Sequence, residues 1–432
     1  MEVRPGYKQT ELGVFPEGWE LKPFGDLFDF SGGVSASRDQ LSETGHCYLH
    51  YGDIHGATKT CVDTHADFQD IPKLDIPLKK VSPRSLLEDG DIVFVDASED
   101  DEGTSRHVIV VNKGNLPFIS GLHTIVAKSK TDELTHEYRR YCFQTAAIKR
   151  QFRFYAVGTK VSGISKSNIP KLLLPFPKPP EQRAIAAALS DVDALLGGLD
   201  RLIAKKRDLK QAAMQQLLTG RTRLPGFSGE WEVRAIRDVV STPITDGPHL
   251  TPKFLADGIP FLSVNNLVNN RIDLQSLRFV SKADHLEFSK KCKPRKGDIL
   301  FGKAASVGMV ALIETDMELN IWSPLALIRV DPPASARFVY YALQANQVHR
   351  QIKLLTNSSS QGNIGMVEIG LLEIPLPAPD EQTAIASALS DMDAELAALE
   401  ARRNKTRDLK QAMMQELLTG NTRLVPAGAA HA

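Results

Sequence analysis

Residues 181–224 read EQRAIAAALSDVDALLGGLDRLIAKKRDLKQAAMQQLLTGRTRL, and residues 381–424 read EQTAIASALSDMDAELAALEARRNKTRDLKQAMMQELLTGNTRL. The two segments align without a gap and are identical at 29 of 44 positions. Ordinary composition would give roughly three identities by chance. The chain of 432 residues is therefore an internal duplication, in which each copy of the segment follows a divergent region of roughly 150 residues.

The repeated segment is typical of one long amphipathic helix. Its apolar residues recur in alternating steps of four and three, which predicts a heptad seam. Pro179 and Pro180 before the segment and Gly220 after it fit the ends of a helix. From residue 181 to about 218 the helix would be ~57 Å long, and a rod of that length needs a partner, for which the other copy is the obvious candidate. The seam residues are Ile185, Leu189, Val192, Leu196, Leu199 and Ile203, then Ile385, Leu389, Met392, Leu396 and Leu399.

Two features extend this interpretation. Gly197 and Gly198 stand where the second copy has Ala397 and Ala398, and a glycine inside a helix costs about 1 kcal/mol relative to alanine. The glycines either let a partner helix approach closely or are drift tolerated in a helix that is held by packing elsewhere. Beyond the seam we expect an apolar face to resume at Leu209, Leu217, Leu218, Leu409, Leu417 and Leu418.

The two divergent regions are mixed α/β by pattern and look like copies of one fold. Apolar runs between Gly, Pro and Asn turns predict strands at 90–95, 107–112, 258–264, 297–302, 307–313 and 325–330, and amphipathic runs predict a helix at 136–152 and another at 336–354. The fold class is therefore α+β, with two mixed α/β domains alternating with two long coiled-coil helices. We place the N-terminal domain at 1–178, the first helix at 179–224, the C-terminal domain at 225–378, the second helix at 379–424 and a disordered tail at 425–432.

Composition excludes several classes of protein. Lys+Arg and Asp+Glu number 52 each, so the chain does not coat nucleic acid by bulk charge, although this leaves room for a local basic surface. The four cysteines form no CxxC pair, which favours reduced thiols over a disulfide scaffold. No apolar run approaches the ~18 residues of a membrane span, and the first residues lack an apolar signal core. We therefore expect a soluble, cytoplasmic, multidomain protein.

Polar residues in turn-rich stretches are candidates for DNA contacts. Asn, Gln, Ser, Thr and Lys offer the donors and acceptors that base edges require in the major groove, and a basic run before a strand suits phosphates. The same stretches also fit ordinary solvated loops, because residues 226–378 hold 16 Lys+Arg against 15 Asp+Glu. The candidate DNA-binding residues are Arg150, Lys160, Ser162, Asp246, His249, Thr251, Asn265, Asn266, Lys290, Lys291, Lys293, Arg295, Lys296, Arg350, Gln361 and Asn363.

No catalytic motif stands out. The chain has no G-x-G-x-x-G and no Walker A loop. Asp331-Pro332-Pro333-Ala334 lacks the aromatic residue of an amino-methyltransferase motif and is typical of a turn after a strand. Cys47, His50, His55, Cys61 and His65 match no common zinc spacing. We therefore expect no catalytic, cofactor-binding or metal-binding residues in this chain.

The tandem motif P-x-x-EQ…I-A…L-S-D-x-D…R-D-L-K-Q-x-x-M-Q-x-L-L-T-G-x-T-R-L resembles the specificity subunit of type I restriction–modification systems, and the resemblance covers essentially the whole chain. In the C-terminal region DGPHLTP (246–252), GIPFLSVNNL (258–267) and GDIL (297–300) are similar to that family's target-recognition domain. The N-terminal region departs more, with Tyr51-Gly52-Asp53-Ile54 in the place of Val264-Asn265-Asn266-Leu267. Residue roles carry over less directly there.

The resemblance implies a non-catalytic DNA specificity subunit. Each divergent region would be a target-recognition domain that reads one half of a bipartite, asymmetric site on double-stranded DNA. The two long helices would pair antiparallel as a spacer and dock two modification (methyltransferase) subunits, which bind S-adenosylmethionine and methylate adenine at N6. Restriction subunits would add ATP- and Mg-dependent translocation and cleavage. Half-sites on one face of a duplex lie about one helical turn, ~34–36 Å, apart, a spacing that rods can set and a flexible linker cannot.

Two other functions compete with this one. A non-DNA scaffold would use the coiled coil to assemble partner proteins, and a pull-down that recovers a methyltransferase would argue against it. A stand-alone methyltransferase would require the chain alone to bind S-adenosylmethionine, and we expect no binding.

Overall fold

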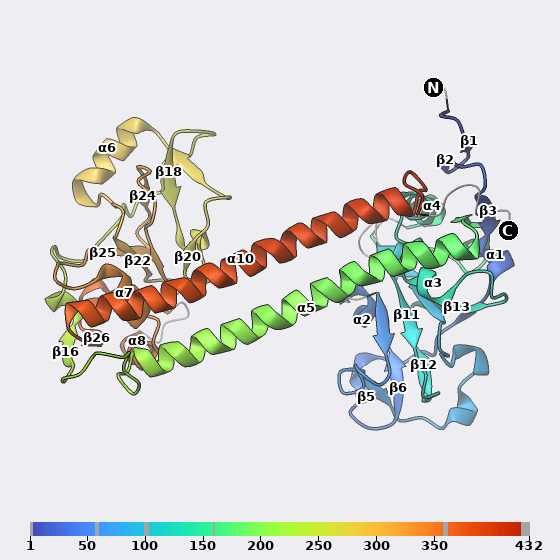
Figure 1. The fold of residues 1–432 in the computed structure, drawn as a ribbon, viewed down its shortest axis with the longest axis horizontal. Helices are drawn as coiled ribbons and strands as arrows, with labels where there is room; N and C mark the ends of the chain where they lie inside the picture. Colours follow the sequence, from blue (N-terminus) through green and yellow to red (C-terminus); the bar gives the residue numbers. More distant parts are fainter. Residues whose placement is uncertain (1–2, 57–59, 99–102, 159, 357–361, 425–432) are drawn as a thin grey trace. The chain divides into compact units, whose positions relative to one another are not determined.

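The chain divides into two compact units, each with its own α/β domain and parts of both long helices. The computed structural model describes residues 3–56, 60–98, 103–158, 160–356 and 362–424. Unit 1 comprises residues 1–198 and 403–432, and unit 2 comprises residues 199–402. The unit boundary crosses both long helices, α5 (Pro179–Leu217) and α10 (Pro379–Leu417), which Figure 1 shows in green and red. The predicted tail at 425–432 lies outside the described residues.

The N-terminal domain, in unit 1, is built on two sheets. The larger has the order β4 (Phe28–Gly32), β13 (Thr124–Ser129), β9 (Ile92–Val95), β11 (His107–Val111), β7 (Cys61–Asp63), and only β7 runs parallel to its neighbour. The smaller has the order β12 (Phe118–Ser120), β6 (His46–Leu49), β8 (Lys73–Leu74), β5 (Leu41–Ser42). Short pairs join β1 (Tyr7–Thr10) to β2 (Gly13–Pro16), β3 (Glu20–Pro23) to β15 (Leu173–Phe176), and β10 (Ala97–Ser98) to β14 (Ser162–Gly163). The helices are α1 (Phe24–Leu27), α2 (Tyr51–Gly56), α3 (His136–Cys142) and α4 (Ala146–Tyr155).

The C-terminal domain, in unit 2, repeats this plan with shorter strands. Its central sheet has the order β17 (Thr245–Asp246), β25 (Leu325–Ile328), β22 (Ile299–Gly302), β23 (Val310–Leu312). A second sheet has the order β21 (Arg278–Val280), β18 (Ile259–Leu262), β24 (Asn320–Ile321). Short pairs join β16 (Glu232–Ala235) to β26 (Glu373–Leu376) and β19 (Leu267–Val268) to β20 (Arg271–Ile272). The helices are α6 (Lys282–Lys291), α7 (Ala336–Ala342), α8 (Asn346–Leu355) and α9 (Met366–Gly370).

The predicted strands are confirmed, since all six coincide with β9, β11, β18, β22, β23 and β25. The single helices predicted at 136–152 and 336–354 are wrong, because each is divided in two. At the break Thr145 and Ala345 have extended backbones, and Oγ1 of Thr145 accepts a hydrogen bond from the N–H of Ile148 at 3.3 Å. The break lets both helices of unit 1 bury aromatic residues, Tyr141 from α3 and Phe152 from α4. The predicted turn after β25 is present at Asp331–Ala334.

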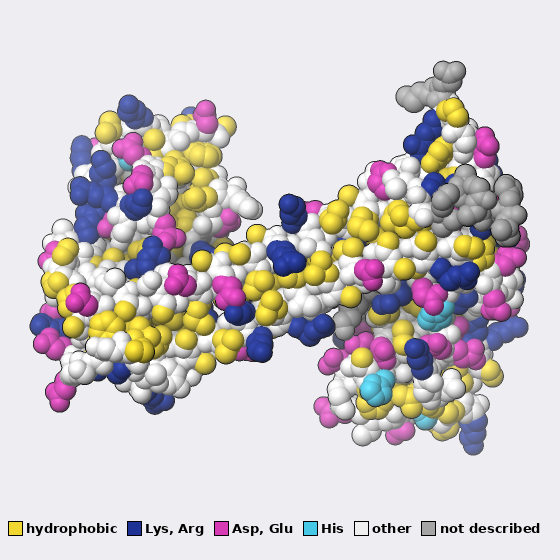
Figure 2. All heavy atoms as spheres, viewed as in Figure 1, with side chains coloured by type: hydrophobic (Ala, Val, Ile, Leu, Met, Phe, Trp, Pro, Cys, Tyr) yellow, Lys and Arg dark blue, Asp and Glu magenta, His cyan; other side chains and the backbone are white. Residues whose placement is uncertain are grey.

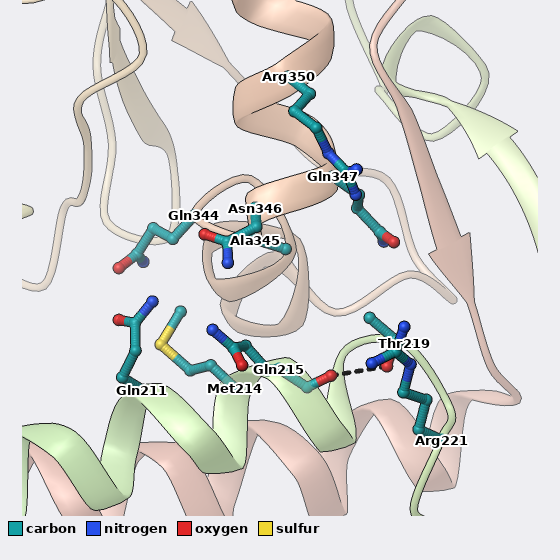
Figure 3. Close-up of a pocket in the computed structure, with 10 residues that line it drawn as sticks. All are labelled: Gln211, Met214, Gln215, Thr219, Arg221, Gln344, Ala345, Asn346, Gln347 and Arg350. Atoms are coloured by element: carbon teal, nitrogen blue, oxygen red, sulfur yellow. Dashed lines mark hydrogen bonds between the residues drawn. The ribbon is translucent and has the colours of Figure 1, made fainter.

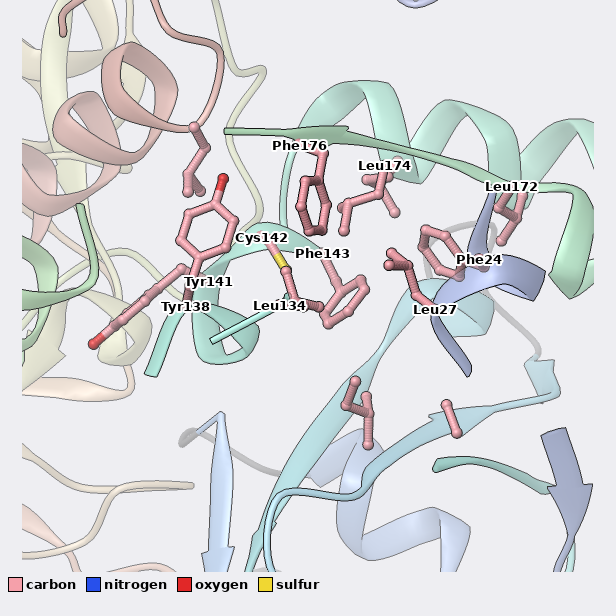
Figure 4. Packing of buried hydrophobic residues seen from close by; sticks show 14 of the residues in the cluster. Phe24, Leu27, Leu134, Tyr138, Tyr141, Cys142, Phe143, Leu172, Leu174 and Phe176 are labelled. Carbon is pink, nitrogen blue, oxygen red and sulfur yellow. The ribbon is translucent and has the colours of Figure 1, made fainter. Parts of the chain in front are cut away.

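One aromatic-rich core in unit 1 joins the sheet to the helices (Figure 4). Phe143 packs edge-to-face against Phe24 and Phe94, with ring centroids 5.5 and 5.4 Å away. The same cluster includes Ile185 and Leu189 from the first turns of α5, Leu417 at the end of α10 and Leu418 directly after it. Unit 2 repeats this arrangement with Ile385, Leu389, Met214 and Leu218. Each domain therefore buries the start of the helix that follows it and the end of the other helix.

A buried glutamate at the start of each long helix binds an arginine just beyond the end of the other; we call this the terminal clamp. Glu181 is 4% exposed and accepts hydrogen bonds from the guanidinium of Arg423, one of them 2.7 Å long, and from Nε1 of Trp19 at 3.0 Å. In unit 2 the clamp consists of Glu381, Arg223 at 2.5 and 2.6 Å, and Trp231 at 3.1 Å. Bidentate Arg–carboxylate contacts are strong, which explains why E-Q and T-R-L persist in both copies.

A second set of contacts explains S-D-x-D and D-L-K. The hydroxyl of Tyr141 donates to Oδ2 of Asp193 at 2.8 Å, and Nζ of Lys410 lies 2.7 Å from Oδ1 of the same carboxylate. Burial raises the pKa of Tyr141 to about 12, so this hydroxyl remains a donor. The same contacts, with the same distances, join Tyr341, Asp393 and Lys210 in unit 2. In each unit the residues of one helix pair with those of the other in reverse order. The predicted antiparallel coiled coil and internal repeat are confirmed.

The predicted heptad seam is confirmed, but the apolar face beyond it is only partly correct. Ile185, Leu189, Leu199 and Ile203 are at most 5% exposed, whereas Leu209 and Leu409 are 47% and 55% exposed. Leu209 follows Leu195 and Leu202 at steps of seven, and those two leucines are also exposed, so it lies on the outer side of the helix. None of the helices in the described ranges is long and apolar enough to span a membrane.

Gly198 does not serve a close helix approach. A Cβ added to this residue would meet no atom within 4 Å. Gly220, by contrast, has a φ of +67° just past the end of α5, a conformation in which any side chain is strained. The interpretation of close approach is therefore wrong at Gly198.

We predict that Gly198→Ala stabilises the chain by about 1 kcal/mol, because alanine has the higher helix propensity. Scanning calorimetry of the full chain should record a higher Tm. Gly220→Ala serves as the control and should lower the Tm, since its left-handed backbone disfavours alanine. A lower Tm for Gly198→Ala would contradict the open space found beside this residue.

Candidate nucleic-acid interface

Three basic side chains of the C-terminal domain meet at one buried carboxylate. Asp246 in β17 is fully buried, and its two oxygens accept hydrogen bonds of 2.5 Å from Nζ of Lys291 and Nζ of Lys303. Nε2 of His249 lies 3.3 Å from the same carboxylate. Gly247 makes this turn feasible, since a Cβ there would lie 1.7 Å from a backbone carbonyl oxygen. We call Asp246, His249, Lys291 and Lys303 the Asp246 cluster.

The Asp246 cluster presents positive charge to solvent. Burial would raise the pKa of Asp246, but the hydrogen bonds from Lys291 and Lys303 hold it below its ordinary value. Two ammonium groups against one carboxylate leave an excess of positive charge. The side chains of Lys291 and His249 are 53% and 73% exposed, whereas that of Asp246 is 1% exposed. Asp246 therefore holds the cations in place from a buried position, and its own contact with DNA stays a prediction.

An exposed basic segment begins at the Asp246 cluster. It runs from the end of α6 into the following turn, and Figure 2 shows Lys and Arg side chains gathered along that side of unit 2. Acidic neighbours partly compensate it, because Glu287 and Asp316 each pair with one of its lysines, at 2.5 and 2.8 Å. Such a surface suits the phosphates of a duplex. Its residues are Lys290, Lys291, Lys293, Arg295 and Lys296, all predicted from the sequence.

The matching edge of the N-terminal domain carries histidines and a tyrosine instead. The ring of Tyr51 in α2 packs against His50, His55 and His123, with centroids 4.6, 6.1 and 5.4 Å away. Nδ1 of His123 lies 3.2 Å from the carboxylate of Asp96. Within the described residues, no group of three His, Cys, Asp or Glu side chains is placed to hold a metal ion.

The topology confirms the predicted equivalence of the segments that begin at Tyr51 and Val264. Each follows a strand that pairs in parallel with another, β6 with β12 and β18 with β24. Asn265 is exposed, but Asn266 is buried. The amide of Asn266 is used within the domain, because it accepts from the N–H of Ser263 and donates to two backbone carbonyls. Asn266 therefore has a structural role within the domain, and its contact with DNA stays a prediction.

The other predicted loop residues are dispersed. Lys160, Thr251 and Asn363 are exposed, and Ser162 is half-buried in β14. Gln361 lies outside the described residues. Lys303 was missed by sequence reasoning, although its place directly after the predicted strand GDILFG is a signal that could have found it.

Arg150 and Arg350 lie apart from these edges, in clefts beside the ends of the long helices. In unit 2 a cleft of about 280 Å³ separates the end of α5 from the start of α8 (Figure 3). Unit 1 has a cleft of about 920 Å³ formed by the equivalent part of α10 and the start of α4. Both are lined by the same repeat positions, which are Gln211, Met214, Gln215 and Thr219 in α5 and its end, and Gln411, Met414, Gln415 and Thr419 in α10 and its end. The repeat therefore presents one helix surface twice.

Comparison with known proteins identifies the family. A family model described as the type I restriction modification DNA specificity domain matches residues 16–203 and 228–406. The chain therefore belongs to this family and carries the domain twice. Each match spans one α/β domain and much of the long helix that follows it, so the domains described above are the target-recognition domains of that family.

Individual relatives span most of this chain. A protein of Methanocaldococcus jannaschii, provisionally named the type I restriction enzyme MjaX specificity subunit, is 24% identical over 97% of both chains. The type I restriction enzyme EcoBI specificity subunit of Escherichia coli is 22% identical over 60% of both chains. The crystal structure of a type I restriction-modification system S subunit from M. genitalium shares the fold, with a TM-score of 0.57 at 16% identity over 96% of this chain and 98% of that one.

We predict that Asp246→Asn destabilises unit 2 by about 2–3 kcal/mol at neutral pH, because it removes the negative charge between two ammonium groups and replaces one of the two accepting oxygens with an amide donor. A carboxylate whose pKa is lowered on folding stabilises the fold above its ordinary value of 3.8 and loses this effect as the pH falls below it. The difference in Tm between wild type and variant should therefore narrow between about pH 5 and pH 3.

Calorimetry of the full chain across this pH range measures the effect. Asp257→Asn is the matched control, since Asp257 is an exposed carboxylate of the same domain, and its Tm difference should stay near zero. A gap between wild type and Asp246→Asn that is constant with pH would contradict the charge-based account.

Proposed function

We propose that this chain is the DNA sequence-specificity subunit of a type I restriction–modification complex. Each target-recognition domain reads one half of a bipartite, asymmetric site on double-stranded DNA. One observation carries this proposal: two domains of the same topology present unrelated polar groups at the same edge, lysines around Asp246 in one and histidines around Tyr51 in the other. Recognition domains that share one fold but carry different surface groups can recognise half-sites of different sequence.

Phosphate contacts in this proposal come from the exposed basic segment at Lys290–Lys296, and base contacts come from the edges around Asp246 and Tyr51. The zero net charge of the chain is compatible with this role, because partner subunits can supply much of the phosphate neutralisation. Family membership supports DNA specificity, while the division of the site into two halves follows from the duplication.

The long helices, in the same proposal, set the spacing of the two half-sites and dock two methyltransferase subunits. Residues 207–212 and 407–412 both read RDLKQA. Within them Leu209 and Leu409 are 47% and 55% exposed. Exposed leucines within a surface that has stayed identical, while the recognition domains diverged, indicate an interface. Two copies of that surface suit two copies of one partner.

Catalysis in the assembled complex is proposed to reside in the partners. The modification subunits would bind S-adenosylmethionine and methylate adenine at N6. Restriction subunits would use ATP and Mg for translocation and endonuclease cleavage. The specificity chain would contribute the choice of sequence and the geometry of assembly.

The complex of this chain with its methyltransferase should protect two short blocks of DNA separated by a spacer of indifferent sequence. Hydroxyl-radical footprinting, followed by single base-pair substitutions, measures this directly. Substitutions in either block should weaken binding by about 1–3 kcal/mol each, and substitutions in the spacer should not. One contiguous sequence-dependent block would refute the proposal that each domain recognises a separate half-site. Normal assembly with no specific protection would favour a protein scaffold.

Leu209→Glu or Leu409→Glu should each cost the chain one bound methyltransferase, and the double variant should bind none. A buried leucine contributes about 1.5–3 kcal/mol to an interface, so each affinity should fall roughly 10- to 100-fold. Native mass spectrometry gives the stoichiometry. Leu195→Glu is the control, because Leu195 is 43% exposed and already has Glu395 as its counterpart. Unchanged stoichiometry in both single variants and in the double variant at Leu209 and Leu409 would place the docking surface elsewhere.

A further inference from the structure

One position in the two recognition domains carries opposite charges. The residue directly after the central strand is Asp96 after β9 and Lys303 after β22. In each domain its N–H donates to a backbone carbonyl, at 3.1 Å and 2.8 Å, and its carbonyl accepts from an isoleucine N–H, at 2.8 Å and 3.0 Å. The partners are His123 and Ile164 in unit 1, and Pro324 and Ile364 in unit 2. These matched hydrogen bonds make Asp96 and Lys303 structurally equivalent.

The two domains also differ at the equivalent position of the neighbouring edge strand. Strand register makes Gly32 of β4 equivalent to Asp246 of β17. Gly32 pairs with Ile125, which pairs on its other side with Phe94. Asp246 pairs with Ala326, which pairs on its other side with Phe301. Both phenylalanines lie two residues before the charged position. In unit 2 the central strand therefore supplies the ammonium group and the edge strand the carboxylate. In unit 1 the central strand supplies the carboxylate, and the edge strand has no side chain there.

The two groups require opposite hydrogen-bonding partners. A lysine ammonium only donates, whereas an ionised aspartate only accepts. In the major groove, lysine is suited to O6 and N7 of guanine, and aspartate to the N4 amino group of cytosine. A carboxylate on a DNA-facing edge is repelled by phosphates, so it contributes favourably only where a base amino group meets it.

Asp96 and Lys303 differ in their exposure to solvent. The side chain of Asp96 is 29% exposed, and its carboxylate lies 3.2 Å from the half-exposed ring of His123. The side chain of Lys303 is 12% exposed, and it shares Asp246 with Lys291. When the flexible stem of Lys303 turns toward a base, Asp246 keeps its hydrogen bond from Lys291. The buried carboxylate is therefore not left without a partner.

We propose that this position determines one base pair in each half-site, with Lys303 selecting guanine in one and Asp96 selecting cytosine in the other. The inference rests on the proposed function and deepens it by naming the reading residue in each domain and the base that it requires.

The test uses the complex of the full chain with its methyltransferase, acting on a DNA library with randomised sequence. Sequencing the methylated molecules yields the recognised motif. Lys303→Gln should reduce the preference for guanine at one position roughly tenfold or more and leave the other half-site unchanged. Asp96→Asn should reduce the preference for cytosine in the opposite half-site to a similar extent. Lys353→Gln, at an exposed lysine on α8, is the control and should leave the motif intact.

An unchanged motif in Asp96→Asn or in a folded Lys303→Gln overturns the inference, as does a change in the wrong half-site. If Lys303→Gln fails to fold, the isosteric Asp96→Asn still tests the inference, because Asp96 lies in the other domain and its side chain is 29% exposed. Weaker methyltransferase binding with an unaltered motif in Asp96→Asn would assign Asp96 to a protein contact and also overturn the inference. A wild-type complex without a bipartite motif would instead refute the proposed function.

Discussion

Both units depend on the contact between a glutamate buried in the first turn of one long helix and an arginine just beyond the end of the other. Glu181 is almost inaccessible to water, so it requires the guanidinium and the indole N–H that reach it. Those groups belong to Arg423 and Trp19, from opposite ends of the described chain. Because a buried charge without partners is costly, the helix ends and the glutamates constrain one another. This constraint accounts for the glutamates and arginines of the clamp being the same in both repeats while the recognition domains diverge.

Much of this architecture could be predicted from local patterns. The duplication, the six strands and the first residues of both long helices follow from periodicity and from proline and glycine punctuation. The two helices end at Leu217 and Leu417, before the predicted bounds of 224 and 424. The break at Thr145 could not be predicted, because no proline or glycine marks it. The terminal clamp was also invisible, since residues 181 and 423 are joined only by tertiary folding. Leu409 misled the prediction, because an exposed interface residue and a core residue look alike in sequence.

The candidate site was less predictable than the fold. His249 lies in a predicted turn-rich stretch and Lys291 in the predicted basic run, but nothing in the sequence indicated that both contact Asp246. Neighbouring asparagines have opposite environments, since Asn265 faces solvent while Asn266 closes a capping box. Side-chain direction in such turns is decided by hydrogen bonds to particular backbone groups up to ten residues away, which composition does not encode. What composition does give is the chemical character of the surface.

The division of unit 1 has a consequence for biosynthesis. Its domain is made first, yet residues 403–424 complete its core and supply Arg423 to Glu181. On the ribosome the nascent recognition domain must therefore wait for the last helix before its buried glutamate is neutralised. A prematurely terminated product would keep a charged, incompletely packed core. Incomplete translation thus leaves the first domain without the helix end that covers its core.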